Sequence, residues 1–370
     1  MSKKSPIKLL VFLPEIGLGG AEWQTIYMLN ELDKNQISSK LLTLNRGIEE
    51  RGKLPDYSIV IKKSIGIDMT FGLRLSRLIK KENPDIVHLI SSTAILWGML
   101  INGFSRSSRF ICSIWGEDYG MSGLRKILLR TTLHLSDLIT VNSYGLRRFV
   151  SREYRIPKSR INVLVNGVDT DRFSPGGAIN LRESLGISGG EFMIGWVGNI
   201  RPEKDFETLI KSAKIILKRY KNVRFLIVGG GIHFEKALDS VKKEGLVEKF
   251  IFTGRVDNTA PYYNVMDLLM NTSVSEGMCN VLLEASSSSL ACVVTDAPGN
   301  SEVILDGRTG FVVKKRDYNA LAEKVSLLID NEKLRCDMAL SAREYILERY
   351  ALNKMVNDYQ NLYLRVCKRL

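Results

Sequence analysis

The stretch that decides the fold of this sequence runs Met193-Ile-Gly-Trp-Val-Gly198-Asn-Ile-Arg201-Pro-Glu-Lys204-Asp-Phe206. Its apolar start is typical of a strand buried on both faces, the run breaks at Gly198, and a helical pattern follows Pro202. Other short runs rich in Val, Ile and Leu alternate with longer helical patterns along the chain. This alternation predicts βαβ units and therefore parallel sheets.

The alternation occurs twice. We expect strands at residues 8–13, 39–44, 86–90, 110–114, 138–141 and 161–165, and again at residues 193–197, 224–228, 251–253, 267–271, 292–295 and 310–313. Clusters of Gly, Pro and Ser at 174–177 and 187–190 interrupt the periodicity, which places a linker there. The expected fold is therefore α/β, with two Rossmann-like domains in tandem that face a cleft, where open sheets bind ligands.

The expected domains cover residues 1–175 and 176–335, followed by carboxy-terminal helices at 336–370. An apolar stripe with helical spacing marks the last helix and must pack on a partner surface. Its members are Val356, Tyr359, Leu362, Tyr363 and Val366.

Size and composition support two ordered domains. A chain of 370 residues exceeds what one hydrophobic core usually supports, and 45% apolar with 25% charged residues is ordinary globular composition. Five scattered cysteines without a C-x-x-C pair indicate neither a disulfide framework nor a zinc knuckle, and they fit a reducing cytoplasm. The apolar run at 94–101 is far shorter than the roughly 20 residues that span a bilayer.

The net charge of +13 is concentrated in the first half of the chain. Residues 1–175 hold 26 Lys and Arg against 16 Asp and Glu, and residues 176–370 hold 27 against 24. A basic half suits an anionic membrane surface, a phosphorylated substrate or simply solvent. The segment Leu124-Arg-Lys-Ile-Leu-Leu-Arg130 resembles a basic amphipathic helix that rests on anionic lipid, although its leucines equally suit a core. No nucleic-acid-binding motif is present.

Two acids lie eight residues apart in Ser275-Glu-Gly-Met-Cys-Asn-Val-Leu-Leu-Glu284-Ala. We expect Glu276 in the loop after a strand and Glu284 one to two turns into the next helix, where both carboxylates can bind hydroxyl groups. By spacing alone, Glu276 is equally suited to be an acid near a helix N-terminus and Glu284 a surface residue.

The turn after residues 193–197 has the composition of a diphosphate site. A glycine-rich turn from strand to helix presents backbone N–H groups, and Arg201 and Lys204 add positive charge. The alternative is a helix started by Pro202 with exposed charges.

Three shorter patterns are less specific. The loop Gly17-Leu-Gly-Gly20-Ala-Glu22 follows the first strand but lacks the full G-x-G-x-x-G spacing of a dinucleotide site. Asp169-Thr-Asp171 has the form of a D-x-D metal motif, but a turn or helix-cap role is the better interpretation. We expect no metal site.

In this order along the chain, the motifs resemble those of the retaining glycosyltransferases of family 4, which have the GT-B fold. The matching segments cover residues 19–22, 113–118, 166–173, 195–206 and 275–285. The resemblance spans almost the whole chain and implies that the last helix returns to the first domain.

The resemblance implies a donor site in the second domain. Glu276 would orient the donor sugar, Glu284 would bind the ribose hydroxyls, and Arg201 and Lys204 would hold the diphosphate. One departure is that Asn199 stands where the family usually has that Arg. The further donor-binding residues implied are Gly19, Gly20, Gly198, Asn199, Arg255, Val256, Gly277, Met278, Asn280 and Val281.

On the acceptor side, the resemblance points to Trp115, Asp118 and His88. Trp115 stands where many members have a histidine beside the reacting centre. His88 lies within the predicted strand at 86–90 and near the cleft, but a lone strand histidine is more often structural.

The function implied is retaining transfer from a nucleotide-diphosphate-sugar to a hydroxyl of a saccharide or lipid-linked saccharide, in the synthesis of surface polysaccharide or glycolipid. The sugar nucleotide would be a co-substrate and no cofactor is expected. The alternatives are a nucleotide-sugar epimerase of the same fold and a non-catalytic sugar-nucleotide-binding protein. We expect a cytoplasmic protein, either free or peripheral on the inner face of the membrane.

Overall fold

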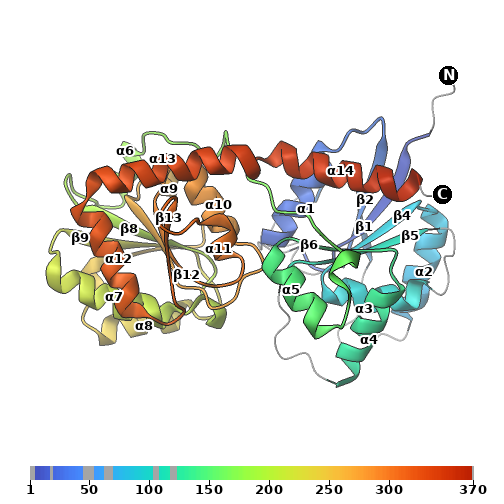
Figure 1. The fold of residues 1–370 in the computed structure, drawn as a ribbon, viewed down its shortest axis with the longest axis horizontal. Coiled ribbons are helices and arrows are strands. Elements are labelled where there is room, and N and C mark those ends of the chain that lie inside the picture. Colours follow the sequence, from blue (N-terminus) through green and yellow to red (C-terminus); the bar gives the residue numbers. More distant parts are fainter. Residues whose placement is uncertain are drawn as a thin grey trace. The chain divides into compact units, whose positions relative to one another are not determined.

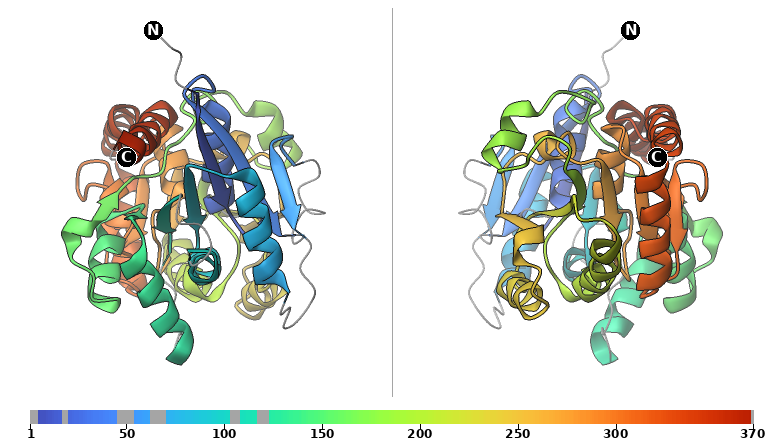
Figure 2. Two further views of the ribbon diagram at one scale, coloured as in Figure 1. Left: turned by 90° about the vertical axis from the view of Figure 1, so that its right-hand side faces the viewer. Right: turned by 90° about the vertical axis from the view of Figure 1, so that its left-hand side faces the viewer.

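A computed structural model describes residues 5–16, 20–44, 54–61, 70–102, 108–116 and 123–368. Its contacts divide the chain into two compact units. Unit 1 comprises Met1–Gly167 with Asn353–Leu370, and unit 2 comprises Val168–Leu352. The expected α/β class with two Rossmann-like domains is confirmed, and in each unit helices cover parallel strands (Figures 1 and 2).

Unit 1 contains a seven-stranded parallel sheet within its described residues, in the order β3-β2-β1-β4-β5-β6-β7. Its strands are β1 (Ile7–Phe12), β2 (Ile37–Leu44), β3 (Ser58–Ile61), β4 (Ile86–Ile90), β5 (Arg109–Ile114), β6 (Leu138–Val141) and β7 (Ile161–Val163). Its helices are α1 (Gly20–Glu31), α2 (Phe71–Glu82), α3 (Ser92–Asn102), α4 (Gly123–Leu135), α5 (Tyr144–Glu153), the short η1 (Lys158–Arg160) and α14 (Leu352–Lys368).

Unit 2 has a six-stranded parallel sheet in the order β10-β9-β8-β11-β12-β13. Its strands are β8 (Phe192–Val197), β9 (Val223–Val228), β10 (Phe250–Gly254), β11 (Leu268–Asn271), β12 (Cys292–Thr295) and β13 (Gly310–Val313). The connecting helices are α6 (Ile179–Ser184), η2 (Pro202–Lys204), α7 (Phe206–Arg219), α8 (Phe234–Lys243), η3 (Val247–Lys249), α9 (Ala260–Tyr263), α10 (Asn280–Ser287), α11 (Asn300–Val303), α12 (Tyr318–Asp330) and α13 (Glu332–Arg349).

The strand order creates one switch point in each sheet. In unit 1, β1 lies between β2 and β4, and in unit 2, β8 lies between β9 and β11. Loops that leave the carboxyl ends of such neighbouring strands diverge, and ligands of open α/β sheets bind between them. In unit 2 these are the loops after β8 and β11, which carry the two motifs with the predicted donor residues.

Strand β3 was missed by the sequence patterns. It is a four-residue edge strand paired only with β2 among the described residues, and its Val60 is exposed. A short edge strand lacks the continuous apolar run by which a doubly buried strand is recognised.

The carboxy-terminal stretch forms two helices that belong to different units. The contacts place α13 in unit 2 and α14, from Asn353 onward, in unit 1. The apolar stripe is the buried face of α14, with Val356, Tyr359, Leu362 and Tyr363 all at most 5% exposed. Figure 1 shows α14 (red) running beside α1 in unit 1.

A buried polar cluster joins α14 to the sheet of unit 1. Alternation along β4 and β5 puts His88 and Ser113 on the same face of the sheet. The Nδ1 of His88 lies 2.8 Å from the hydroxyl of Tyr363, and its Nε2 lies 2.6 Å from Oγ of Ser113. Burial lowers the pKa of His88 to about 3, so the ring is neutral near pH 7.

Candidate functional site

The loop after β8 is shaped by close contacts with the neighbouring strand ends. Gly198 has φ +147°, and a Cβ added at Gly229 would lie 2.1 Å from the carbonyl oxygen of Gly198. A Cβ at Gly231 would lie 2.7 Å from the backbone nitrogen of Ile200. Such approaches leave no room for a side chain at Gly229 or Gly231, and the positive φ of Gly198 favours glycine there.

The same packing changes the expectation that backbone N–H groups of this loop bind a diphosphate. The amide of Gly198 donates to the carbonyl of Val228 at 3.0 Å, and the amide of Ile200 donates to that of Gly230 at 2.6 Å. These two N–H groups are therefore already used within the protein. A diphosphate at this loop would depend mainly on cationic side chains.

Two cations lie on the turn that follows. Arg201 is exposed, precedes η2 and forms no ion pair with a described residue. Lys204 ends η2 and is largely buried, with 16% of its side chain exposed. Asp205 then caps α7, accepting from the amide of Thr208, which fixes where the helix begins.

The loop after β11 brings Glu276 to Lys204. The Lys204 ammonium and Oε1 of Glu276 form an ion pair, and the hydroxyl of Ser273 donates to the same oxygen at 2.8 Å. Burial alone would lower the pKa of Lys204, but the charge and hydrogen bond of Glu276 outweigh it and raise this pKa. Lys204 is therefore a fixed positive charge at the switch point of the sheet.

The backbone ties the same two loops together. The amide of Val274 donates to the carbonyl of Glu203 at 2.8 Å, and the hydroxyl of Thr272 donates to the carbonyl of Lys204 at 2.7 Å. Glu276 itself lies outside the helix that follows, which differs from its alternative interpretation as a helix-terminal acid.

Glu284 lies one turn into α10, as expected from the glycine and the apolar run before it. It is not a freely solvated surface residue, because the hydroxyl of Tyr263 donates to its Oε2 at 2.7 Å. Burial raises the pKa of Glu284 to about 7, against the opposing effects of the Tyr263 hydrogen bond and the Arg172 charge. The group can therefore change its charge near neutral pH.

The remaining predicted donor residues surround these loops unevenly. Gly277 and Met278 are buried, whereas Asn199, Val256, Asn280 and Val281 are partly accessible. Arg255 is exposed just after β10. Gly277 is backed by Gly299, where an added Cβ would lie 2.3 Å from the Gly277 carbonyl oxygen.

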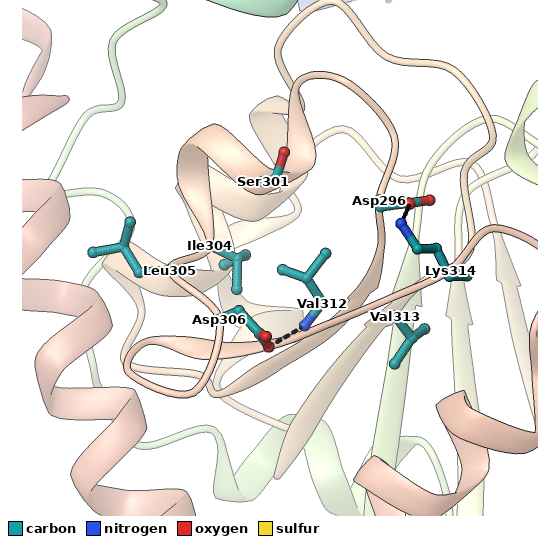
Figure 3. Close-up of a pocket in the computed structure, with 8 residues that line it drawn as sticks. All are labelled: Asp296, Ser301, Ile304, Leu305, Asp306, Val312, Val313 and Lys314. Carbon is teal, nitrogen blue, oxygen red and sulfur yellow. Dashed lines mark hydrogen bonds and ion pairs between the residues drawn. The ribbon is translucent and has the colours of Figure 1, made fainter.

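An open hollow of about 540 Å³ lies beside this region in unit 2. Figure 3 shows Lys314 paired with Asp296 at one side, while Asp306 accepts from the amide of Val312 at another. None of its eight lining residues belongs to the predicted donor set. The turn between Asp296 and Ser301 connects the two regions, because it carries Gly299, whose backbone lies against Gly277.

In unit 1 the predicted residues are less closely grouped. Gly19 and Asp118 lie outside the described residues, while Gly20 starts α1. Trp115 follows β5 and is partly buried. His88 has no exposed surface and both its ring nitrogens bind protein groups, so the structure assigns it to the docking of α14 and removes it from direct contact with an acceptor.

Metal ligation finds no support among the described residues, which contain no group of three or more His, Cys, Asp or Glu placed to hold an ion. Asp169 instead accepts from the amides of Asp171 and Arg172 at 3.2 and 3.0 Å. This is the turn role expected for the D-x-D pattern.

Sequence reasoning missed several polar residues around Glu276 and Glu284. Asn271 ends β11 and Ser273 follows it, Asn300 begins α11 and Tyr263 ends α9. Polar side chains at the end of an apolar strand or directly after it were a usable signal for the first two. Tyr263 and Asn300 carried none, since their role depends on which segments fold side by side.

Comparison with known proteins gives matches to both units. Residues 18–172 match the family described as Glycosyltransferase Family 4, and residues 178–345 match the family described as Glycosyl transferases group 1.

Two curated relatives cover most of the chain. The N-acetyl-alpha-D-glucosaminyl L-malate synthase of Bacillus anthracis is 26% identical over 81% of this chain and 80% of its own length. An Escherichia coli UDP-Gal:alpha-D-GlcNAc-diphosphoundecaprenol alpha-1,3-galactosyltransferase is 25% identical over 87% of this chain and 88% of its own. A solved structure, Anabaena Alr3699/HepE in complex with UDP-glucose, has a TM-score of 0.83 at 17% identity, covering 98% of this chain and all of that one.

The packing of the glycine loops makes a direct prediction. Gly229→Ala should destabilise unit 2 by roughly 2–4 kcal/mol, because the new Cβ clashes with the Gly198 carbonyl and φ at Gly229 is +129°. Urea unfolding would measure the change. Gly189→Ala is the matched control, since nothing lies within 4 Å of its Cβ position. Equal stability of the two variants would contradict the packing argument.

Proposed function

The chain belongs to glycosyltransferase family 4, and from this premise we propose that it transfers a sugar, with retention of anomeric configuration, from a nucleotide-diphosphate-sugar to a hydroxyl acceptor. The observation that carries the proposal is the meeting of Lys204 and Glu276 at the switch point of the unit 2 sheet. A diphosphate requires a fixed cation, and the hydroxyls of the sugar attached to it require a hydrogen-bond acceptor beside that cation.

Each donor residue has a distinct role in this proposal. Lys204 and Arg201 bind the diphosphate, Glu276 accepts hydrogen bonds from the sugar hydroxyls, and Glu284 accepts them from the ribose. The hydroxyl of Tyr263 donates to Oε2 of Glu284 and the side chain of Thr259 also hydrogen-bonds this carboxylate, and the two contacts together hold it in place. Hydrogen bonds to charged groups contribute about 1.5–3 kcal/mol each, so the two carboxylates strongly favour a ligand with correctly spaced hydroxyls.

Positioning and charge stabilisation account for the chemistry. The bond between the anomeric carbon and the phosphate oxygen breaks, and the acceptor oxygen forms its bond to that carbon on the same face. The departing phosphate oxygen takes the acceptor proton. Lys204 and Arg201 offset the charge that develops on the diphosphate, the kind of electrostatic contribution that supplies several kcal/mol in a site that excludes water.

The acceptor class is proposed from the relatives. One carries N-acetylglucosamine linked to malate in its name and another acts on a diphosphoundecaprenol-linked sugar, so we propose a saccharide or lipid-linked saccharide hydroxyl here. The cation that the diphosphate requires is available from the chain itself. We therefore propose transfer without a metal ion.

Transfer is tested by incubating the protein with a panel of nucleotide-sugars and acceptors and measuring released nucleoside diphosphate. We expect release that persists in a chelator, and a loss of at least about a hundredfold in Glu276→Ala with nucleoside diphosphate affinity retained. A Glu276→Ala loss of affinity alone would indicate a binding protein. Interconversion of free nucleotide-sugars would indicate an epimerase, and loss of activity in chelator would refute metal independence.

The pKa of Glu284 predicts a pH dependence of donor binding. The carboxylate accepts hydrogen bonds more strongly than the neutral acid, and its pKa of about 7 lies above the ordinary value. The ionised form is therefore present above pH 7 and lost below it. Affinity for a nucleotide-sugar should fall by up to about tenfold from pH 8 to pH 6.

Calorimetric titration at the two pH values measures this dependence. A nucleotide-sugar is the suitable ligand, because it lacks the terminal phosphate that titrates near pH 6. Glu284→Gln should bind with an affinity that hardly changes with pH. The same tenfold fall in this variant would assign the dependence to another group.

Contact with an anionic membrane is proposed through α4. In the described residues no helix is both long and apolar enough to cross a membrane. Helix α4 exposes Leu124 by 69% and Ile127 by 62%, and the exposed Arg125 and Arg130 flank that apolar stripe by helical geometry. The core side of the same helix is formed by Leu129 and Leu133, whereas Leu124 and Ile127 stay exposed among the described residues.

Sedimentation with vesicles tests this surface. We expect binding to vesicles that contain phosphatidylglycerol, weakened at least about fivefold by Leu124→Ser combined with Arg125→Ser. Leu340→Ser is the matched control, because Leu340 is a 59% exposed leucine of unit 2. Unchanged binding by the α4 variant would exclude α4 as the contact.

A further inference from the structure

Two buried carboxamides connect neighbouring loops of unit 2. Asn271 is 3% exposed and Asn300 has no exposed surface. The Nδ2 of Asn300 donates to Oδ1 of Asn271 and to the carbonyl of Thr295, each at 3.1 Å. The side chain of Asn300 therefore ties the loop after β12 to the end of β11.

The hydrogen-bonded connection continues from Asn271 to Glu276. Oδ1 of Asn271 also accepts from the amide of Ser273 at 3.1 Å, and the hydroxyl of Ser273 donates to Oε1 of Glu276 at 2.8 Å. The hydroxyl of Thr295 donates to the carbonyl of Ser273, so that residue is held from both sides. An unbroken chain of hydrogen bonds thus runs from Asn300 to Glu276.

This series of hydrogen bonds fixes the orientation of the Glu276 carboxylate. Ser273 and Lys204 both donate to Oε1, and no described residue donates to Oε2. With Oε1 fixed by two donors, the direction of Oε2 is also fixed. That oxygen is then available to a hydroxyl without further ordering of the side chain, which is how preorganisation assists transfer.

Stability alone does not account for Asn300. Its Oδ1 is buried and has no hydrogen-bond partner among the described residues, which makes the carboxamide costly at this position. The backbone of the neighbouring Gly299 lies against Gly277, so the same turn also packs against the loop that carries Glu276. Both observations point to a turn built to fix the loop that carries Glu276.

We propose that Asn300 and Asn271 are positioning residues that set the orientation of the Glu276 carboxylate toward the donor sugar. The inference rests on the proposed function and extends it to two residues outside the motif. Neither carboxamide touches the donor. Their effect reaches it through Ser273 and Glu276.

Asn300→Asp tests the proposal at nearly constant size. It replaces the Nδ2 donor by a carboxyl oxygen that faces Oδ1 of Asn271 and the carbonyl of Thr295, so attraction becomes repulsion. Asn271→Asp is the milder counterpart, since its carboxylate still accepts from Ser273 and Asn300 and only the bond from Nδ2 to the Cys279 sulfur is lost. Asn331→Ala is the control for stability, because it removes a helix cap of α13 far along the chain from the site.

Three quantities are measured for each variant: kcat for transfer, Kd for the nucleotide-sugar and Kd for the nucleoside diphosphate. For Asn300→Asp we expect kcat to fall at least tenfold and nucleotide-sugar affinity to fall several-fold, with nucleoside diphosphate affinity unchanged within twofold. Asn271→Asp should lower kcat less than Asn300→Asp does, because both contacts that Oδ1 of residue 271 accepts are retained. Asn331→Ala should lower thermal stability without changing the three quantities.

A double-mutant cycle separates positioning from general loosening. In a Glu276→Gln background, Asn300→Asp should cause almost no further loss of kcat, since its effect passes through the Glu276 carboxylate. An equal loss in both backgrounds, a parallel loss of nucleoside diphosphate affinity, or an unaffected Asn300→Asp would overturn the inference alone. A wild-type protein that binds no nucleotide would overturn the proposed function and this inference with it.

Discussion

The ion pair between Lys204 and Glu276 joins two loops that leave adjacent strands of the unit 2 sheet. Parallel strand order makes these loops diverge, and the pair joins them across the switch point. Much of the surrounding structure serves this contact: glycines at the ends of β8 and β9 let the first loop pack closely, and the Asn271 and Asn300 carboxamides support the second.

In unit 1, the position of helix α14 likewise depends on buried polar contacts. The apolar stripe of α14 would pack on many surfaces, but the bonds from His88 to Tyr363 and Ser113 fix its register on this sheet. Burial keeps the His88 pKa near 3, so the contact persists as a neutral hydrogen-bonded group across the physiological range. A residue expected on the acceptor side thus belongs to the architecture of the unit.

Sequence patterns predicted the parallel sheets, nearly all strands and the last helix, because doubly buried strands and amphipathic helices carry strong periodic signals. They failed at β3, whose four residues at a sheet edge carry a weak signal, and at Asn300 and Tyr263, whose partners lie 29 and 21 residues away along the chain. The motifs placed Lys204 and Glu276 in loops but not their contact. Sequence patterns also did not reveal that the amides of Gly198 and Ile200 are already hydrogen-bonded, because their partners lie at the end of β9 and in the loop after it.

We propose that the loops after β8 and β11 form one binding site for a nucleotide-diphosphate-sugar. Hydrogen–deuterium exchange with and without a nucleotide-sugar tests it most directly, because it reports on each loop separately. We expect slower exchange in residues 198–206 and in residues 272–284, with both effects lost in Lys204→Met. Protection of neither segment, or protection elsewhere that survives Lys204→Met, would contradict it.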